Sequence, residues 1–439
     1  KISLIDCCSS SRNKTKIRME IIAAYGTIFA ILAIIFGLFM TWGIGANDLA
    51  NAMGTSVGSG AVTIRQAIII AIIFEFSGAV LAGGHVTSTI RKGIIDPSGI
   101  VNNPEILVYG MLASLLATAF WLMIASWKGW PVSTTHSIIG ALIGFAIVGI
   151  GTDAVKWGKV GSVVASWVVS PVVGGTVAFL LVMSTRKLIF NTNDPLKNAK
   201  RYAPVYVFLV GFIISLVTIF KGLRHLKIDL SVSQSFCVAI LLGLLSACLS
   251  WIFIRKVKED RDADRDFHFA SVEMVFAPMM IFTACAMAFA HGSNDVANGI
   301  GPLAAVISII SSGGEVMQES DLPVWVLLLG GTGIVLGLVT LGYRVMMTVG
   351  QKITELTPST GFCAQLAAAT TVVIASRTGL PVSTTHILVG AVLGVGIARG
   401  IGALDLRVVI DIFISWLVTL PAGAIMSMLF FFVLKGIFG

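Results

Sequence analysis

The amino-acid sequence predicts an all-α membrane protein with about twelve transmembrane helices, arranged as two inverted-topology repeats with broken or re-entrant helices at the midplane. Three observations support this fold class: a very apolar composition, a series of long apolar runs, and two motifs that each occur twice. Of 439 residues, 56% are hydrophobic and 12% are charged, which is about half the charge typical of soluble domains. The mean hydropathy is +0.94. A soluble globular protein is therefore excluded.

The apolar runs predict the individual spans. Each run is continuous, as in IIAAYGTIFAILAIIFGLF, whereas the strands of an outer-membrane barrel alternate apolar and polar residues. A helix needs about 20 apolar residues to cross the bilayer core. Suitable runs lie near residues 21–43, 66–90, 106–127, 131–150, 158–183, 204–221, 235–254, 272–291, 324–343, 360–377, 381–398 and 406–434.

Two duplicated motifs divide the chain into halves. GANDLAN at 45–51 returns as GSNDVAN at 292–298, and PVSTTH at 131–136 recurs unchanged at 381–386. The number of residues between the two copies is nearly the same for both motifs, as in the internal repeats of many secondary transporters. We predict a first repeat over 19–184, a connecting region with two spans and cytoplasmic loops over 185–270, and a second repeat over 271–439.

The first 18 residues differ in composition from the rest of the chain. KISLIDCCSSSRNKTKIR is polar and basic, whereas MEIIAAYGTIF, from Met19 onward, resembles a natural start. We therefore expect residues 1–18 to be an extraneous or disordered segment outside the fold.

Basic residues predict the orientation, because Lys and Arg of short loops are concentrated on the cytoplasmic side. The loop near 186–202 has five basic residues against one Asp, whereas the loop at 312–323 has three acidic residues and no basic one. We therefore place the first loop and the charged run at 255–266 inside, and the second loop outside. Counting spans then places both termini outside and inverts one repeat relative to the other. This topology places the loop with Lys221, Arg224 and Lys227 on the external side, which the preference of basic residues for the cytoplasm does not favour.

The segments that carry the NDxAN motifs, 45–63 and 292–311, are rich in glycine and polar residues. We expect each to be a broken or re-entrant helix that returns to its own side of the membrane. Non-helical backbone at membrane depth must line a cavity or be buried in protein. Both segments are therefore expected beside a midplane site.

The NDxAN motifs predict a cation site. An ionised aspartate near the bilayer centre costs about 2.5 to 3.5 kcal/mol on insertion scales, so a cation should offset its charge. A small alkali ion takes oxygen ligands, which carboxylates, amides and unwound main chain supply. Capping of broken helices is the simpler alternative for part of each motif. The predicted sodium ligands in the motifs are Asn47, Asp48, Asn51, Asn294, Asp295 and Asn298.

The PVSTTH motifs predict an anion site. Each begins with proline, which is favoured at the first position of a helix, and helix N-termini bind anions through free N–H groups and the helix dipole. Hydroxyl groups in the first turn add neutral donors. Two such helix starts that converge from inverted halves would surround a tetrahedral oxyanion. The predicted ligands are Ser133, Thr134, Thr135, Ser383, Thr384 and Thr385.

Four further polar residues lie within apolar runs. Glu75 has no acidic counterpart in the second half and is a candidate ion ligand or proton site. Gln365 either belongs to the site or forms a hydrogen bond that joins two helices. His136 and His386 could titrate or pack as neutral groups. We include Glu75 and Gln365 among the predicted sodium ligands.

The sequence resembles the PiT family of inorganic phosphate transporters. GANDLANAMGTSVGSGAVTIRQA, HGSNDVANGIGPLAA and the duplicated PVSTTH carry the resemblance, which covers essentially Met19 to Gly439. It implies twelve spans, inverted repeats, external termini and cation-coupled phosphate uptake, with Asp48, Asp295 and Glu75 at positions important for transport. The first signature followed by FEFSGAV resembles the sodium-coupled branch.

The leading hypothesis is a plasma-membrane symporter that imports phosphate with sodium and needs no other cofactor. Proton coupling, a metal–phosphate complex, sulfate as substrate and a passive anion channel remain alternatives. An enzyme is disfavoured because GxSxG and HExxH motifs are absent from the sequence, and an ATP-driven pump because GxxxxGK[ST] is absent. The net charge of +8 indicates orientation and not nucleic-acid binding. A homodimer is left open.

Overall fold

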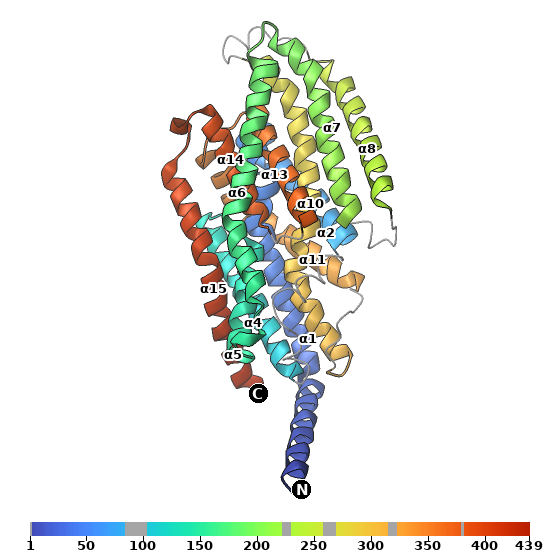
Figure 1. Ribbon diagram of the computed structural model, residues 1–439, viewed down its shortest axis with the longest axis vertical. Coiled ribbons are helices and arrows are strands. Elements are labelled where there is room, and N and C mark those ends of the chain that lie inside the picture. Colours follow the sequence, from blue (N-terminus) through green and yellow to red (C-terminus); the bar gives the residue numbers. More distant parts are fainter. Residues whose placement is uncertain (1, 84–102, 222–229, 258–268, 315–322, 379–381) are drawn as a thin grey trace.

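The computed structural model describes residues 2–83, 103–221, 230–257, 269–314, 323–378 and 382–439. These residues form an elongated helical bundle, shown in Figure 1, and no strand occurs among them. The α-helices and two π-helical turns are α1 (Ile2–Gly58), α2 (Ile64–Ala82), α4 (Pro104–Lys128), α5 (Thr134–Gly149), α6 (Trp157–Thr185), η4 (Arg186–Phe190), α7 (Pro195–Lys221), α8 (Val232–Ile254), α10 (Ala270–Ser311), α11 (Val324–Thr340), α12 (Gly342–Met347), η6 (Thr348–Lys352), α13 (Pro358–Thr378), α14 (Thr384–Arg399) and α15 (Leu406–Phe438); two short 3-10 helices are η3 (Thr152–Ala154) and η7 (Ile401–Ala403).

Each predicted apolar run overlaps a helix, although the run at 66–90 ends and the run at 381–398 begins outside the described residues. Within the described part of the chain, eight helices are long and apolar enough to cross a membrane, or nine if the bent pair of α11 with α12 and η6 counts as one span. By contrast, α5 and α14 have 16 residues each, which corresponds to about 24 Å. The multi-pass, all-α class is confirmed, and these two runs are shorter than full spans.

Local sequence signals explain where several helices begin and end. Thr63 and Gln66 form a capping box at the start of α2, and Ser231 and Gln234 form another at α8. Such reciprocal bonds satisfy main-chain N–H groups that a helix start leaves unpaired. At the end of α4, Gly129 takes a left-handed conformation with φ of 71°, which glycine adopts without steric cost.

Contrary to expectation, the helix does not break at either NDxAN motif: α10 continues through the second segment to Ser311, and α1 continues to Gly58, so that within 45–63 the chain leaves the helix only over 59–63, before α2. The glycines there serve close packing. A Cβ at Gly45 would lie 1.9 Å from the Ile334 carbonyl oxygen, and one at Gly58 would lie 1.9 Å from that of Gly350. Small residues allow such close approach of helices in membranes.

The breaks occur elsewhere. The chain leaves the helix between α4 and α5, where the first PVSTTH motif lies, and α11 bends by 63° into α12 and η6. In the segment expected to be extraneous or disordered, the described residues are helical, since α1 begins at Ile2; its extraneous origin stays a prediction. A helical N-terminal segment therefore extends from the bundle at the end labelled N in Figure 1.

Several helix contacts made in one half of the chain have corresponding contacts in the other half. Helix α1 contacts α4 and α11, whereas α10 contacts α13 and α2; α5 packs on α15, and α14 packs on α6. In Figure 1, α1 and α10 run in opposite directions, as do α6 and α15. This reciprocal, antiparallel arrangement is the geometry of inverted repeats.

Glycines at corresponding positions of α5 and α14 allow each helix to pack closely against a helix of the other repeat. On α5, a Cβ at Gly140 would lie 2.3 Å from the Leu420 carbonyl oxygen of α15. On α14, a Cβ at Gly390 would lie 2.3 Å from the Pro171 carbonyl oxygen of α6. The equal distances show that both halves bring their short helix equally close to the other repeat.

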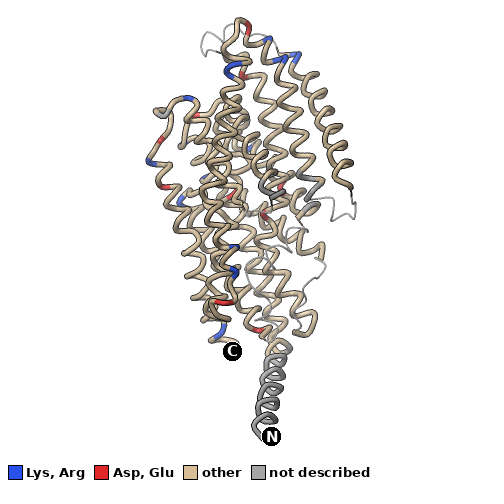
Figure 2. Tube along the Cα trace, viewed as in Figure 1, with Lys and Arg blue, Asp and Glu red and all other residues tan. Residues whose placement is uncertain are grey.

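The charges differ between the two ends of the molecule. Figure 2 shows Lys and Arg gathered around the connection between α6 and α7, at the end opposite both termini. The acidic residues of the loop at 312–323 and most of the run at 255–266 lie outside the described residues, as do Arg224 and Lys227.

Candidate functional site

The two PVSTTH motifs meet in the interior. Ser133 and Ser383 cap α5 and α14, each accepting a hydrogen bond of 3.2 Å from the main-chain N–H of the histidine three residues later. The rings of these histidines, His136 and His386, lie 4.8 Å apart. Thr385 Oγ1 also donates to the Val132 carbonyl oxygen at 3.3 Å. Two helix N-termini, from opposite repeats, therefore converge on one place.

An asparagine from each repeat holds a threonine from the other. Asn51 Nδ2 donates to Thr385 Oγ1 at 2.9 Å, and Asn298 Nδ2 donates to Thr135 Oγ1 at 3.2 Å. Weaker contacts of the same kind join Asn51 to Thr384 at 3.5 Å and Asn298 to Thr134 at 3.4 Å. The NDxAN and PVSTTH motifs thus form one composite site to which both repeats contribute.

Both asparagines also hold the aspartate of their own motif. Asn51 Nδ2 lies 2.8 Å from Asp48 Oδ1, and Asn298 Nδ2 lies 3.2 Å from Asp295 Oδ1. Threonine hydroxyls of the second repeat reach both carboxylates, since Thr385 donates to Asp48 at 3.3 Å and Thr384 donates to Asp295 at 3.4 Å. The two aspartates consequently lie beside the helix starts.

A buried histidine joins the acidic residues. His291 Nε2 lies 2.9 Å from Asp295 Oδ2 and 3.5 Å from Asp48 Oδ2, and His291 Nδ1 lies 3.4 Å from Glu75 Oε1. All four side chains are at most 1% exposed. Sequence reasoning missed His291. Aligning the repeats would have found it, because His291 precedes GSNDVAN where the first repeat has Ile44 before GANDLAN.

Several buried oxygen atoms of this cluster make no hydrogen bond within the described residues: Asp48 Oδ2, Asn51 Oδ1, Glu75 Oε1 and Glu75 Oε2. Buried polar atoms are nearly always hydrogen-bonded, so each exception needs an explanation. Unpaired carboxylate and amide oxygens are the ligands that hard cations prefer. In addition, one ligand atom each of Asp48, His291 and Asp295 lies within 4.8 Å of the others. The cluster can therefore hold a cation.

Other predicted site residues brace the surroundings. Asn47 donates to the Trp130 carbonyl oxygen at 2.9 Å and accepts from Val132 N at 3.0 Å, which fixes the turn between α4 and α5. Gln365 donates to the Ala52 carbonyl oxygen at 2.7 Å and accepts from Thr283 at 2.6 Å, which links α13 to α1 and α10. These two amides are occupied by hydrogen bonds between elements.

The site is closely packed on most sides. Thr135 and Asn294 are only partly buried, whereas the other predicted ligands are buried. Asn294 donates to Asp295 Oδ1 at 3.1 Å. A cavity of about 20 Å³ lies beside His291, Asn294 and Thr384, which is roughly the room that one water molecule needs.

Duplicated helix starts facing an acidic cluster, inside an apolar bundle of inverted repeats, are the architecture of a multi-pass transport protein. The comparisons with known proteins agree. A model of the phosphate transporter family matches residues 44–427, and the chain belongs to that family. The family consists of transporters and not of enzymes.

Relatives resemble the chain over most of its length. A Haemophilus influenzae protein assigned as a phosphate permease is 52% identical over 420 residues, covering 96% of this chain and 100% of the relative. Inorganic phosphate transporter 2-1, chloroplastic, of Arabidopsis thaliana is 43% identical and covers 92% of this chain and 72% of the relative. A solved structure described as the sodium-dependent phosphate transporter superposes with a TM-score of 0.83 at 43% identity, covering 93% of this chain and 99% of that one.

Proposed function

We propose that the protein is a secondary symporter that imports inorganic phosphate together with sodium by alternating access. The observation that carries this proposal is the convergence of two inverted helix starts on a buried acidic cluster, several of whose oxygens make no hydrogen bond among the described residues. An anion and a cation can be held side by side at such a place. The sodium-dependent phosphate transporter with a similar structure supports the choice of both ions.

The phosphate ligands in this proposal are the hydroxyls and main-chain N–H groups of the two helix starts. The helix dipoles place partial positive charge there, and charge-assisted hydrogen bonds to an oxyanion are stronger than neutral ones. The two helices approach from opposite repeats, so a tetrahedral anion can accept from both at once. The proposed ligands are Ser133, Thr134, Thr135, Ser383, Thr384 and Thr385.

The sodium ligands in this proposal are the oxygens beside those helix starts. Asp48, Asp295 and Glu75 supply charge, and Asn51 supplies an amide oxygen that accepts no hydrogen bond from the described part of the chain. Asn294 and Asn298 orient the carboxylate of Asp295. Asn47 and Gln365, proposed from the sequence as ligands, support the site through neighbouring main chain.

Electrostatics explains the proposed coupling. Without a cation, the carboxylates repel phosphate, because like charges interact strongly where water is excluded. Sodium bound beside the anion lowers the cost of burying both. Phosphate therefore binds well only after sodium, and the two ions move together. The inverted repeats supply the two related conformations that alternating access requires.

The topology follows from the same reasoning. We propose repeats at 19–184 and 271–439 joined by 185–270, with the basic end of Figure 2 in the cytoplasm and both termini outside. We place the protein in the cell membrane. The relative from Arabidopsis is named as chloroplastic, so localisation of a tagged full chain by fractionation is the test of this part.

A specific observation favours a second candidate, coupling through a metal–phosphate complex. His291 adds an imidazole nitrogen to the carboxylates of Asp48 and Asp295, and imidazole suits transition metals rather than sodium. In this case phosphate would enter with a divalent metal, and a sodium gradient would have no effect.

Uptake of radiolabelled phosphate into proteoliposomes separates these candidates. The proposal predicts accumulation above the external concentration when sodium is imposed outside, and none with a proton gradient or a divalent metal alone. Metal-dependent uptake without sodium would favour the second candidate. Phosphate entry that only equilibrates, with or without sodium, would indicate a channel. Competition by sulfate tests the anion.

A further inference from the structure

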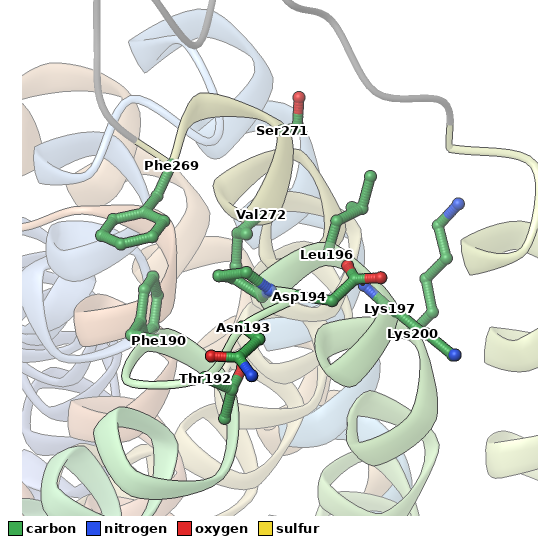
Figure 3. A pocket seen from close by; sticks show the side chains of 11 residues that line it. Phe190, Thr192, Asn193, Asp194, Leu196, Lys197, Lys200, Phe269, Ser271 and Val272 are labelled. Atoms are coloured by element: carbon green, nitrogen blue, oxygen red, sulfur yellow. The ribbon is translucent and has the colours of Figure 1, made fainter.

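A cavity of about 820 Å³ lies far from the composite site, at the end of the molecule opposite the termini. Figure 3 shows its lining, which comes from η4, the connection to α7, the first turns of α7 and the start of α10. Three candidate spans end or begin here, at Phe190, Pro195 and Ala270. The cavity therefore lies at the level where lipid headgroups meet the protein.

Two irregularities of the backbone shape its wall. α6 ends in the π-helical turn η4, which includes Phe190, and Phe269 has a left-handed conformation with φ of 74°. π-Turns occur often at functional sites, and a non-glycine residue adopts a left-handed conformation only where the surrounding structure holds it there. The two rings meet edge to face with centroids 5.3 Å apart. Together they give the cavity an aromatic side.

The polar side of the cavity favours an anion. Lys197 and Lys200 line it, and a bond from Lys200 Nζ to the Val257 carbonyl oxygen holds the second of them in place. Among the described residues of the lining, the one acidic side chain, Asp194, accepts from Lys197 N at 3.0 Å as a cap of α7. Thr192 and Asn193 add neutral polar groups. The cationic ends thus outnumber the carboxylate, which the helix start already uses.

We propose that this cavity binds the phosphate-bearing headgroup of an anionic phospholipid, with Lys197 and Lys200 facing the phosphate and the Phe190–Phe269 wall facing the glycerol and first methylene groups. Basic pockets at the ends of membrane helices suit such headgroups. A soluble phosphate ester offers the same charge, and the position at the span ends favours the lipid. This site is separate from the proposed transport site and does not depend on which ion is carried.

Native mass spectrometry of the purified full chain tests the proposal. The protein is titrated with dioleoylphosphatidylglycerol, with zwitterionic dioleoylphosphatidylcholine, and with glycerol 3-phosphate, which is the soluble counterpart of the anionic headgroup. Lys197→Ala/Lys200→Ala is compared with Lys159→Ala/Lys435→Ala, which removes two exposed lysines at the other end. Lys197→Arg/Lys200→Arg keeps the charge, and a melting temperature checks each fold.

We expect the alanine pair to weaken phosphatidylglycerol binding roughly 25-fold, from about fivefold for each lysine. The arginine pair and the distant control should stay close to the unaltered protein, and phosphatidylcholine binding should not change. Equal phosphatidylglycerol affinity in the folded alanine pair would overturn the site. Lysine-dependent binding of glycerol 3-phosphate without lysine-dependent binding of the lipid would overturn the lipid as occupant.

Discussion

The two repeats contribute equally to one part of the composite site and unequally to another. At the helix starts, Asn51 holds Thr385 and Asn298 holds Thr135, so each contact has its counterpart. In the acidic cluster, Glu75 and His291 contact each other and have no counterparts. Helix α11, the partner of α2, has no acidic residue, and Ile44 stands where the second repeat has His291.

This difference indicates a division of roles. A tetrahedral anion can accept similar bonds from two related helix starts, so symmetric elements suit phosphate. A cation beside it would lie nearer one repeat, because the cluster oxygens of Asp48, Asn51 and Glu75 that make no hydrogen bond among the described residues all belong to the first repeat. We therefore propose that phosphate binds to the symmetric elements and sodium to the asymmetric cluster.

The largest expected effect is on the aspartates. Asp48→Asn and Asp295→Asn should each reduce sodium-driven phosphate uptake to background, because each removes a proposed cation ligand from a buried site. Insertion should not suffer, since loss of a midplane charge eases it. Uptake into proteoliposomes, normalised to folded protein, is the measurement. Normal sodium dependence in both variants would refute the cation site.

The threonines test the symmetry. Thr135→Ala and Thr385→Ala should weaken phosphate binding by similar factors, about 10- to 150-fold each, which corresponds to about 1.5 to 3 kcal/mol for a hydrogen bond to a charged ligand. Equilibrium binding at saturating sodium is the measurement. Thr332→Ala, where the exposed hydroxyl bonds its own helix at 2.8 Å, is the control. An effect from one repeat only would disprove a shared anion site.

A change in the asymmetric Glu75–His291 pair should affect sodium binding and not phosphate binding. Glu75→Gln removes a carboxylate whose oxygens make no hydrogen bond among the described residues, so sodium affinity should fall on the order of tenfold, or about 1.4 kcal/mol. Phosphate affinity at saturating sodium should hardly change. Sodium titration of phosphate binding measures both, with Glu355→Gln, at an exposed position, as control. A loss confined to phosphate affinity would contradict the division of roles.

The smallest expected effect is on stability. Gly140→Ala and Gly390→Ala place a Cβ 2.3 Å from a carbonyl oxygen of the other repeat, and such overpacking costs about 1 to 3 kcal/mol. Both should lower the melting temperature by similar amounts. Gly161→Ala, which meets nothing within 4 Å, should leave it unchanged or raise it. Unequal losses would show that the repeats are not packed alike.

Sequence reasoning predicted the span positions and the meeting of the motifs well, because apolar runs and exact repeats are local signals. It misplaced the helix breaks. Glycine and polar residues at 45–63 suggested a broken helix. Gly45 and Gly58 instead allow the backbones of α11 and η6, which are distant in sequence, to approach α1 closely. Whether a glycine bends a helix or packs it depends on partners that one segment does not reveal.

The site was predicted in part for the same reason. Duplication indicated Asn51, Asp48 and their counterparts, whereas His291 has no duplicate and was missed. The cross-pairing of Asn51 with Thr385 depends on the inverted packing of whole repeats. Asn47 matches Asn294 in sequence, but its amide fixes the turn before α5, which motif comparison alone does not show.

The most direct test of the central claim is the number of phosphate ions bound per chain, measured by equilibrium dialysis with radiolabelled phosphate at saturating sodium. One site shared by both repeats predicts one phosphate per chain, no binding when sodium is replaced by an inert cation, and weakened binding in both Thr135→Ala and Thr385→Ala. Two phosphates per chain, with each variant weakening only one of them, would contradict a shared site.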